Sequence, residues 1–351
     1  MLYLEVDSQD AAYHFSVEEY LLQHFDLTQP IVMLWQTKPC VMLGQYQIAE
    51  REIEMSQAEE KEVAIVRRPS GGGAIFTDSG TFLLSLILPA KFDNDGSYDS
   101  FPQKAARAEF AELLIAVLKQ LGIPAKLEGR NDILLEGKKV SGMAQHVHKG
   151  RSCTHGSLLF DADLKLLVEL LRVDDEKFQT KAVKSIRSRV TNIKEYAIEQ
   201  DLALATATPQ DFAAQFKSAL YEMLDACRYR LSEEEKERIA DIYQKKYGNP
   251  NWARKKAPKF DLHAAKRFPA GKLEVYLSVT KGIVSTCSIH GDFLGTTPTC
   301  KLERQLVGLP YQRSDFQSAL EQMAEQTTKQ AALSSYLGDI SAEEFLSCVF
   351  D

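Results

Sequence analysis

The chain has 351 residues, 44% of them hydrophobic and 26% charged, with a formal net charge of −7. This length predicts two domains, because a single hydrophobic core rarely extends beyond about 250–300 residues. The acidic balance argues against a general nucleic-acid-binding protein, which would carry a basic surplus.

The six cysteines show no C-x-x-C spacing, so neither a zinc site nor a disulfide framework is indicated: Cys40, Cys153, Cys227, Cys287, Cys300 and Cys348. The first seven residues include acids and lack the basic start of a signal peptide. No apolar run approaches the roughly 20 residues of a membrane span. We therefore expect a cytoplasmic protein with reduced cysteines that binds neither nucleic acid nor membrane.

Short apolar runs in the first quarter of the chain predict strands. Residues 31–35 and 40–43 flank Thr37-Lys38-Pro39 and are expected to form a strand pair. Residues 63–66 form another short apolar run. Thr81 to Leu88 is almost entirely apolar, which favours a strand covered on both faces. Helices must therefore flank this sheet.

Three consecutive glycines, Gly71 to Gly73, follow the run 63–66 and the pair Arg67-Arg68. Without Cβ atoms, such a run can turn successive backbone N–H groups toward an anion. Neighbouring arginines supply forked donors suited to phosphate. The pattern indicates a phosphate cradle, and it is equally consistent with a tight turn whose arginines lie in solvent.

Apolar residues at helical spacing predict a helix from about Gln103 to Leu121, which Gly122 and Pro124 would stop. A second helix is expected to begin near Ser232, where Ser232 and Glu235 fit a capping box. It should end near Tyr247.

Gly248-Asn249-Pro250 is the predicted domain boundary, which separates residues 1–248 from 249–351. Beyond it, residues 272–279 and 283–289 alternate in polarity around a turn and predict a hairpin. Helical periodicity then dominates residues 314–348.

Another hairpin is expected where residues 131–135 and 139–144 flank Glu136-Gly137-Lys138. Strand alternation would put alternate residues on opposite faces: Lys139, Ser141 and Met143 on one, Val140, Gly142 and Ala144 on the other. A glycine inside a strand often marks the close approach of a ligand. A solvated hairpin with lysines at its tip is the alternative.

Two further stretches carry polar residues for which the sequence allows two roles. His155 begins the strand-like run to Leu159, and it could be catalytic or structural. Residues 185–192 contain Arg187 and Arg189, which could bind an anion or cap a helix.

Taken in series, five motifs make this sequence resemble the lipoate–protein ligase family. They are Arg67-Arg68-x-Ser70-Gly71-Gly72-Gly73-Ala74, Gly129-Arg130-Asn131-Asp132, Lys139-Val140-Ser141-Gly142, His155-Gly156-Ser157-Leu158-Leu159 and Ser188-Arg189-Val190-Thr191-Asn192. The likeness continues past Pro250, where that family carries a small accessory domain. It implies an α+β fold, with a large biotin- and lipoyl-ligase-like mixed sheet flanked by helices and a small α/β C-terminal domain.

The resemblance also implies an ATP-dependent reaction. Lipoate and ATP, with Mg²⁺, would give lipoyl-AMP and pyrophosphate. The lipoyl group would then pass to a lysine of a lipoyl-domain protein, either an acyltransferase subunit of a 2-oxoacid dehydrogenase or the glycine-cleavage H protein.

Site residues follow by matching motif positions. Lys139 would be catalytic and would hold the lipoate carboxylate and the α-phosphate together, and Asp132 would help to place Mg²⁺. The residues expected at ATP or the adenylate are Arg68, Ser70, Gly71, Gly72, Gly73, Ala74, Ile75, Phe76, Thr77, Asn131 and Lys139. Those expected at lipoate are Lys139, Ser141, Gly142, His155 and Gly73, with Val17, Trp35 and Leu43 lining the apolar tail.

The chain departs from the family pattern at three places. Thr77 stands where the family often has His, Gln47-Ile48 where it has Gln-Asn, and Phe15-Ser16-Val17 where it has Asn-Leu-Ala. Two rival functions are considered apart from these departures. One is an ATP-independent octanoyl or lipoyl transferase with Cys153 as nucleophile, and the other is a non-catalytic binder of lipoyl domains.

Overall fold

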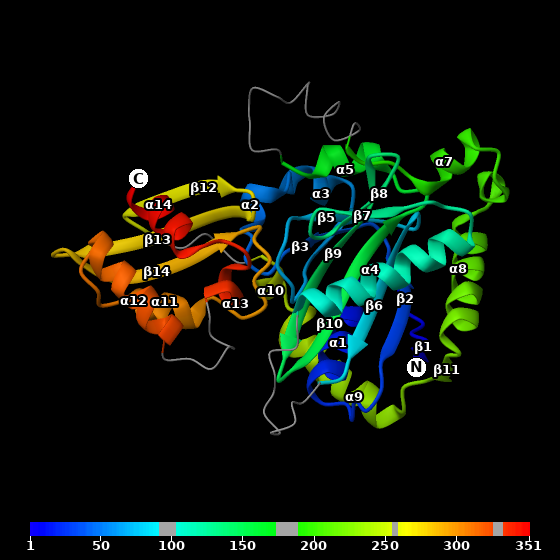
Figure 1. The fold of residues 1–351 in the computed structure, drawn as a ribbon, viewed down its shortest axis with the longest axis horizontal. Coiled ribbons are helices and arrows are strands. Elements are labelled where there is room, and N and C mark those ends of the chain that lie inside the picture. Colours follow the sequence, from blue (N-terminus) through cyan, green and yellow to red (C-terminus); the bar gives the residue numbers. More distant parts are fainter. Residues whose placement is uncertain (91–102, 173–188, 255–258, 326–332) are drawn as a thin grey trace.

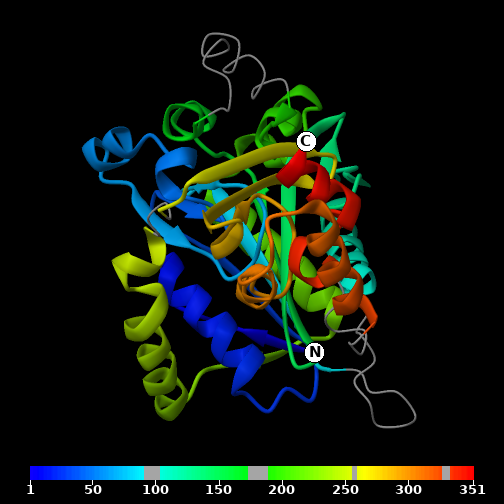
Figure 2. The same cartoon turned by 90° about the vertical axis from the view of Figure 1, so that its left-hand side faces the viewer.

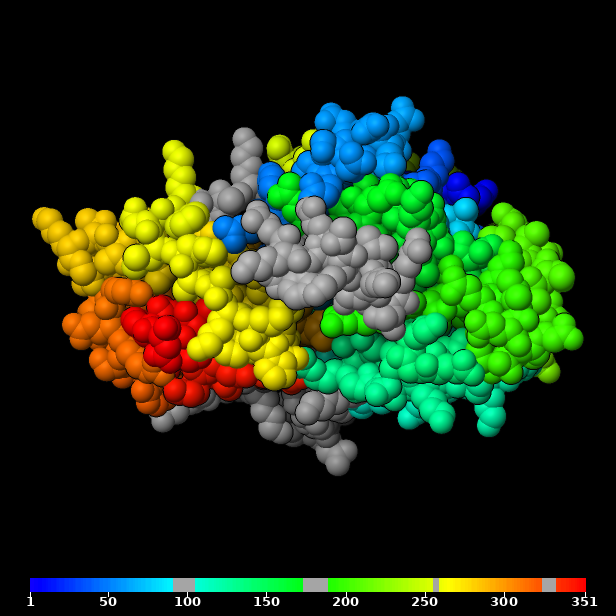
Figure 3. Space-filling model, turned by 90° about the horizontal axis from the view of Figure 1, so that it is seen from above, coloured from blue at the N-terminus to red at the C-terminus, as the bar shows by residue number. Residues whose placement is uncertain are grey.

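The structure is a computed structural model that describes residues 1–90, 103–172, 189–254, 259–325 and 333–351. It consists of a larger N-terminal unit and a smaller C-terminal unit that pack directly against each other (Figures 1 and 3). Among the helices described, none has the length and apolar character that a membrane span requires.

The N-terminal unit holds most of the secondary structure. Its strands are β1 (Leu2–Leu4), β2 (Ile31–Gln36), β3 (Cys40–Leu43), β4 (Ala64–Arg67), β5 (Ile75–Thr77), β6 (Thr81–Leu88), β7 (Lys126–Glu128), β8 (Asp132–Leu135), β9 (Lys138–His148), β10 (Arg151–Leu159) and β11 (Cys227–Tyr229). Its helices are α1 (Ala11–Gln23), α2 (Ala49–Glu52), α3 (Met55–Glu60), α4 (Gln103–Gln120), α5 (Leu164–Leu170), α7 (Ile193–Glu199), η2 (Ala203–Thr206), α8 (Pro209–Leu224), α9 (Glu233–Ile242), the π-helical turn η3 (Tyr243–Tyr247) and α10 (Pro250–Ala253).

Eight of the described strands form one mixed sheet in the order β11-β1-β2-β6-β10-β9-β8-β7. Strands β11, β1 and β2 run parallel, and the remaining pairs are antiparallel. One apolar core joins α4 and α8 to this sheet, and a second joins α1 and α9 to its other face (Figure 2). Every residue of β6 is buried, so the expected strand covered on both faces is confirmed.

A second, small sheet with the order β4-β3-β5 holds the glycine loop between β4 and β5. The expected strand pair of 31–35 with 40–43 is therefore wrong: β2 pairs with β1 and β6, whereas β3 pairs with β4 and β5. The connection does not form a hairpin turn, because Lys38 donates its N–H to Gln9 and Pro39 accepts from Ala64. The chain thus crosses from one sheet to the other at Pro39.

The two helices expected from spacing and capping are confirmed. Helix α4 ends just before Gly122, whose φ of +82° suits a residue without Cβ. Ser232 and Glu235 form the capping box of α9, which continues through η3 to Tyr247.

The C-terminal unit contains β12 (Leu262–Phe268), β13 (Gly271–Thr280), β14 (Ile283–Gly291), α11 (Cys300–Leu306), α12 (Arg313–Glu325), α13 (Leu333–Leu337) and α14 (Ala342–Phe350). Strands β13 and β14 form the expected hairpin, and the described parts of 314–348 are largely helical. Strand β12 was not expected and completes an antiparallel sheet in the order β12-β13-β14. The observed architecture agrees with the expected α+β class with a small C-terminal α/β unit.

Candidate active site

The glycine loop is built around the side chain of Arg68. Its guanidinium group is buried and donates to the carbonyl oxygens of Met42 (3.0 Å), Gly71 (2.8 Å) and Gly73 (2.7 Å). Burial lowers the pKa of Arg68 to about 10, so the group stays charged at neutral pH. The described structure therefore uses Arg68 to shape the loop, and contact with phosphate remains a prediction.

Arg67 likewise does not lie in solvent. It is buried and donates to the carbonyl oxygens of Gly44 (2.7 Å), Trp252 (3.0 Å) and Ala253 (3.0 Å). The interpretation of this stretch as a turn with exposed arginines is wrong for both residues, because backbone carbonyls replace water as their partners. Arg67 thereby ties α10 to strand β4.

One of the glycine N–H groups already has a partner from the C-terminal unit. Gly72, with φ of +91°, donates to the carbonyl oxygen of Phe293 at 3.1 Å. A Cβ on Gly71 would lie 2.3 Å from the same oxygen. The loop after β14 therefore covers the glycine loop, and stacking of Phe293 on Tyr46 at 4.7 Å between ring centroids secures it.

The hairpin of β8 and β9 is confirmed, but its faces differ from simple alternation. Val140 is an extra residue in β9, because Ile133 pairs with Ser141 while Leu134 pairs with Lys139. A bulge of this kind reverses the alternation beyond it. Lys139 and Gly142 consequently share the pocket face, so their expected placement on opposite faces is wrong.

Lys139 forms an ion pair with Asp132, whose Oδ1 lies 2.8 Å from Nζ. The Lys139 ammonium passes directly over Gly142. A Cβ added to Gly142 would lie 2.7 Å from both Cε and Nζ of Lys139. Gly142 thus provides the space that Lys139 occupies. Lys138 is exposed at the start of β9 and takes no part in this arrangement.

A pocket of about 150 Å³ lies between the glycine loop and this hairpin. Nine of the expected site residues line it: Arg68, Gly72, Gly73, Ala74, Ile75, Asn131, Lys139, Gly142 and His155. The others lie just outside: Ser70, Gly71, Phe76, Thr77, Asp132 and Ser141. Phe76 packs in the core below α2 and α3, and Thr77 shares a hydrogen bond of 2.8 Å with Thr37. Any contact of Phe76 or Thr77 with a ligand would therefore come from the backbone.

The apolar wall of the pocket was assigned to the wrong side chains. Leu43, Trp35 and Val17 are buried in the cores of the N-terminal unit and do not line it. The apolar side chains that line the pocket are Phe15, Met42, Ile75, Leu83, Met143 and Leu294. Met42 and Leu43 exchange roles because neighbouring strand residues face opposite sides.

His155 belongs to a buried chain of hydrogen bonds. Its Nε2 lies 2.6 Å from the hydroxyl of Ser70, and its Nδ1 lies 2.9 Å from the Glu18 carboxylate. Burial alone would raise the pKa of Glu18, but the neighbouring histidines lower it below its usual range. An ionised Glu18 thus orients His155 against the start of the glycine loop.

Cys153 is fully buried on the same strand as His155. Burial raises the pKa of its thiol well above the usual value, and the Glu18 carboxylate raises it further. In this state the thiol is neither exposed nor ionised, which is the opposite of a reactive cysteine.

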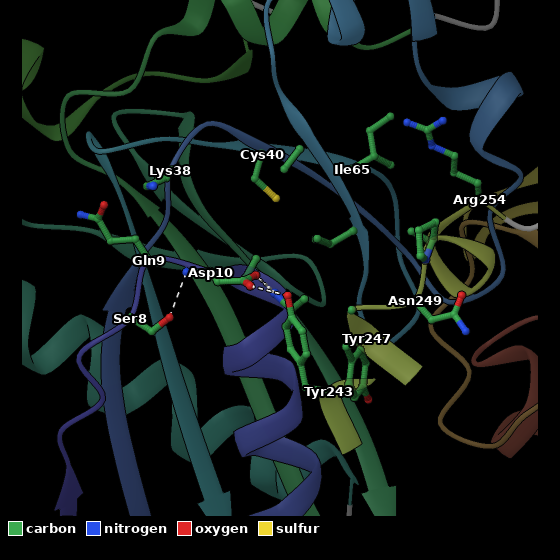
Figure 4. Close-up of a pocket in the computed structure, with 17 residues that line it drawn as sticks. Ser8, Gln9, Asp10, Lys38, Cys40, Ile65, Tyr243, Tyr247, Asn249 and Arg254 are labelled. Carbon is green, nitrogen blue, oxygen red and sulfur yellow. Dashed lines mark hydrogen bonds between the residues drawn. The ribbon is translucent and has the colours of Figure 1, made fainter. Parts of the chain in front are cut away.

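A larger cavity, of about 770 Å³, lies between the start of α1, strand β4 and the segment 243–254 (Figure 4). Its polar lining includes Asp10, Lys38 and Arg254, and Tyr243 donates to Asp10 at 2.9 Å. None of the five motifs contributes a described residue to its lining. The charged and glycine-rich motifs converge instead on the smaller pocket.

Comparison with known proteins decides the family. Residues 10–220 match the model of the lipoyl protein ligase A/B catalytic domain, and residues 257–349 match that of the bacterial lipoate protein ligase C-terminus. The chain belongs to the lipoate–protein ligase family. The resemblance seen in the five motifs is thereby confirmed.

Individual lipoate–protein ligases are similar to this protein along nearly its whole length. Lipoate-protein ligase LplJ of Bacillus subtilis is 35% identical over 99% of this chain and 100% of its own length. The lipoate–protein ligase of Streptococcus pyogenes is 29% identical over 97% of this chain and 96% of its own length.

Solved structures share the fold. Plasmodium falciparum LipL1 in complex with lipoate superposes with a TM-score of 0.74 at 20% identity, over 99% of this chain and 97% of that one. A lipoate-protein ligase A bound with ATP gives a TM-score of 0.59 at 20% identity, over 72% of this chain and 98% of that one.

The sequence analysis missed two components of this candidate site. Glu18 directly follows Phe15-Ser16-Val17, a stretch already compared with the family pattern, so its position was an available signal. Phe293 and Leu294 carry no such signal, because a backbone carbonyl that reaches 221 residues back to Gly72 leaves no local pattern. Ser188 of the fifth motif lies outside the described residues, whereas Asn192 holds Ala162 through hydrogen bonds of 3.0 Å.

Proposed function

We propose that this lipoate–protein ligase works in two steps at the pocket between the glycine loop and the β8–β9 hairpin. The observation that supports this most is Lys139, a partly exposed ammonium at the pocket wall beside Asp132 and opposite the glycine loop. Such a cation faces the place where a carboxylate and a phosphate would meet.

In the first step, a carboxylate oxygen of lipoate attacks the α-phosphorus of ATP. A new C–O–P linkage forms, and the bond between the α-phosphorus and the bridging oxygen breaks to release pyrophosphate. Lys139 neutralises the anions that approach each other, a task in which positioning and electrostatics dominate. Loss of one such fixed donor typically costs about 10²–10³-fold in rate.

Asp132 is the residue that would hold Mg²⁺. Its Oδ1 lies 2.8 Å from the Lys139 ammonium, and its carboxylate is partly exposed beside the pocket. One carboxylate combined with substrate phosphates is the usual way in which proteins bind this ion. The residues present therefore fit Mg²⁺, which when bound would offset the charge of the phosphates.

The nucleotide needs more space than the pocket offers. Small-molecule sites typically enclose about 300–1,000 Å³, whereas this pocket holds about 150 Å³, and Leu294 forms part of its wall. We infer that the C-terminal unit moves away from the glycine loop when ATP binds. This movement would free the Gly72 N–H for a phosphate oxygen.

The division into residues 1–248 and 249–351 remains a proposal. The hydrogen bonds from Arg67 to Trp252 and Ala253 favour a hinge C-terminal to Ala253, because they hold α10 on the larger unit.

In the second step, the lysine amine of a lipoyl-domain protein attacks the acyl carbon, loses a proton, and expels AMP. We propose acyltransferase subunits of 2-oxoacid dehydrogenases and the glycine-cleavage H protein as acceptors. The solved ligase of Thermoplasma acidophilum, described with its E2 lipoyl domain, supports acceptors of this kind.

The test is pyrophosphate release from ATP with lipoate, octanoate or biotin as the acid. We expect release with lipoate and acyl transfer to a lipoyl domain that requires ATP. Transfer from an octanoyl carrier without ATP would favour the transferase, and binding of a lipoyl domain without pyrophosphate release would favour the non-catalytic binder.

A further inference from the structure

Four side chains of different chemistry meet beneath the pocket: Glu18, His146, Cys153 and His155. Cys153 and His155 alternate on β10 and so face the same side, and His146 on β9 pairs directly opposite Cys153. Glu18 reaches this group from α1. Their potential ligand atoms all lie within 4.8 Å of one another.

The cluster is deeply buried, yet it is incompletely satisfied. All four residues are buried, and Glu18 and Cys153 have no exposed surface. Among the described residues, Nε2 of His146 has no hydrogen-bond partner, because its neighbour, Oε2 of Glu18, is 3.8 Å away. A buried ring nitrogen that lies near a carboxylate without a hydrogen bond is costly unless another group satisfies it.

The donor set matches a borderline divalent cation. Thiolate, imidazole and carboxylate are the ligands of Zn²⁺, with bonds of roughly 2.0–2.3 Å that place tetrahedral ligands about 3.3–3.8 Å apart. Two of the present separations lie below that range or at its upper end, 2.9 Å from Glu18 to His155 and 3.8 Å from Glu18 to His146, and all lie within 4.8 Å. Shifts of about 1 Å or less would close the site. One carboxylate and one thiolate also cancel the charge of the ion, so the buried site would be neutral.

The groups around the cluster have the arrangement of an outer coordination shell. Nε2 of His155 lies 2.6 Å from the Ser70 hydroxyl, so Nδ1 is the ring nitrogen that faces the cluster. Nδ1 lies 2.9 Å from Oε2 of Glu18, and a bound ion would replace this hydrogen bond. Oε1 of Glu18 accepts from Ser85 at 2.6 Å, which leaves Oε2 toward the histidines. Ligating histidines and carboxylates are normally held through their second polar atom in this way.

We propose that Glu18, His146, Cys153 and His155 bind one Zn²⁺ in a closed, structural site. Binding displaces the thiol proton of Cys153 and any proton that His155 and Glu18 share, and it leaves both imidazoles neutral. The ion fixes the orientation of His155 and, through Ser70, the start of the glycine loop. The spacing of the cysteines did not indicate this site, because its ligands come from α1 and two strands.

The experiment uses the full-length protein with any affinity tag removed and metals stripped by a chelator. The protein is loaded with Zn²⁺ for elemental analysis and with Co²⁺ for absorption spectroscopy. We expect one tightly held ion per chain, the intense visible absorption of tetrahedral Co²⁺, and a thiolate-to-cobalt charge-transfer band.

Three variants sharpen this test. Cys153→Ser should lose the charge-transfer band and weaken Zn²⁺ binding by more than the roughly 10–100-fold typical of an outer-shell partner. His146→Gln should weaken binding similarly and serves as a second variant if Cys153→Ser does not fold. Cys40→Ser, at a buried cysteine outside the cluster, should bind like the parent protein.

Failure to retain metal after dialysis would overturn the proposal, and so would an octahedral cobalt spectrum. Persistence of the charge-transfer band in Cys153→Ser would also overturn it. These readouts do not depend on ligase activity, so they are independent of the proposed function.

Discussion

The backbone N–H of Gly72 donates a hydrogen bond of 3.1 Å to the carbonyl oxygen of Phe293, which belongs to the other unit of the chain. Under the proposed function, a phosphate oxygen at the glycine loop would need the same N–H group. Docking of the C-terminal unit and binding of the nucleotide would then compete for one donor. Such a competition would link the position of the small unit to the first half-reaction.

Gly72→Val should raise the KM for ATP by about 10-fold or more. A β-branched residue at φ of +91° is strained, and about 1–2 kcal/mol of strain corresponds to roughly a 10-fold change. Steady-state pyrophosphate release measures this. Gly282→Val is the control, because Gly282 has φ of +77° in an exposed turn with open space around it. Equal KM values for ATP in all three proteins would leave the glycine loop without a role in nucleotide binding.

Glu274→Gln should lower the KM for ATP by about two- to five-fold. Glu274 on β13 pairs with Arg51 of the larger unit at 2.6 Å. Glu274 is buried but Arg51 is more than a third exposed, so we take the screened value of about 0.5–1 kcal/mol for this contact between the units. Weaker docking leaves the Gly72 N–H more available. Glu343→Gln is the control for loss of an ion pair within one unit, because the exposed Glu343 pairs with Arg313 inside the C-terminal unit. A raised KM in Glu274→Gln would contradict the competition.

Docking of the two units should also weaken in acid. Burial alone would raise the pKa of Glu274, but Tyr276, Lys272 and Arg51 outweigh it and lower the pKa below the usual 4.5. The contribution of this carboxylate to docking is therefore fully present above pH 4.5 and is lost as the pH falls through the lowered value. Small-angle scattering should show expansion over this range. In Glu274→Gln the expansion that comes from protonation of Glu274 should be absent. An identical transition in this variant would mean that other groups cause the expansion.

Gly142→Ala should reduce adenylation by about 10–100-fold without lowering the melting temperature appreciably. The new Cβ would meet the end of the Lys139 side chain, which is flexible enough to move away from Asp132. Misplacement of a positioning group by about 1 Å can cost 10²-fold in rate. Single-turnover formation of lipoyl-AMP measures the effect, and an unchanged rate would mean that the observed position of Lys139 is unimportant.

Cys153 should carry no acyl group at any stage. Its sulfur is fully buried, whereas a nucleophile must be accessible to the acyl donor. Intact mass after incubation with an octanoyl carrier protein, without ATP, checks this. A hydroxylamine-labile adduct that maps to Cys153 would support the rival function of an ATP-independent transferase.

Local patterns in the sequence predicted the elements well, because caps and periodicity are encoded by neighbouring residues. The capping box of Ser232 and Glu235 and the buried strand from Thr81 to Leu88 are examples. Pairing was harder. Nothing local distinguishes β3 as a partner of β4 rather than of β2, since the choice depends on the chain crossing at Pro39.

The sequence predicted which residues meet at the pocket better than it predicted their geometry. Lys139 and Gly142 were expected together and both line the pocket, but the extra residue Val140 places them on one face. A bulge of a single residue is invisible to a count of alternating positions. Arg67 and Arg68 were also identified, yet both donate to backbone carbonyls that come from distant segments.

The central claim is that Lys139 is the cation that joins carboxylate and α-phosphate. The decisive measurement is formation of lipoyl-AMP and pyrophosphate from lipoate and ATP by the parent protein, Lys139→Ala and Lys138→Ala, each shown to be folded. We expect Lys139→Ala to lose about 10²–10³-fold in rate and Lys138→Ala, at an exposed neighbour, to stay within about two-fold. A Lys139→Ala variant that forms lipoyl-AMP at the parent rate would contradict the account.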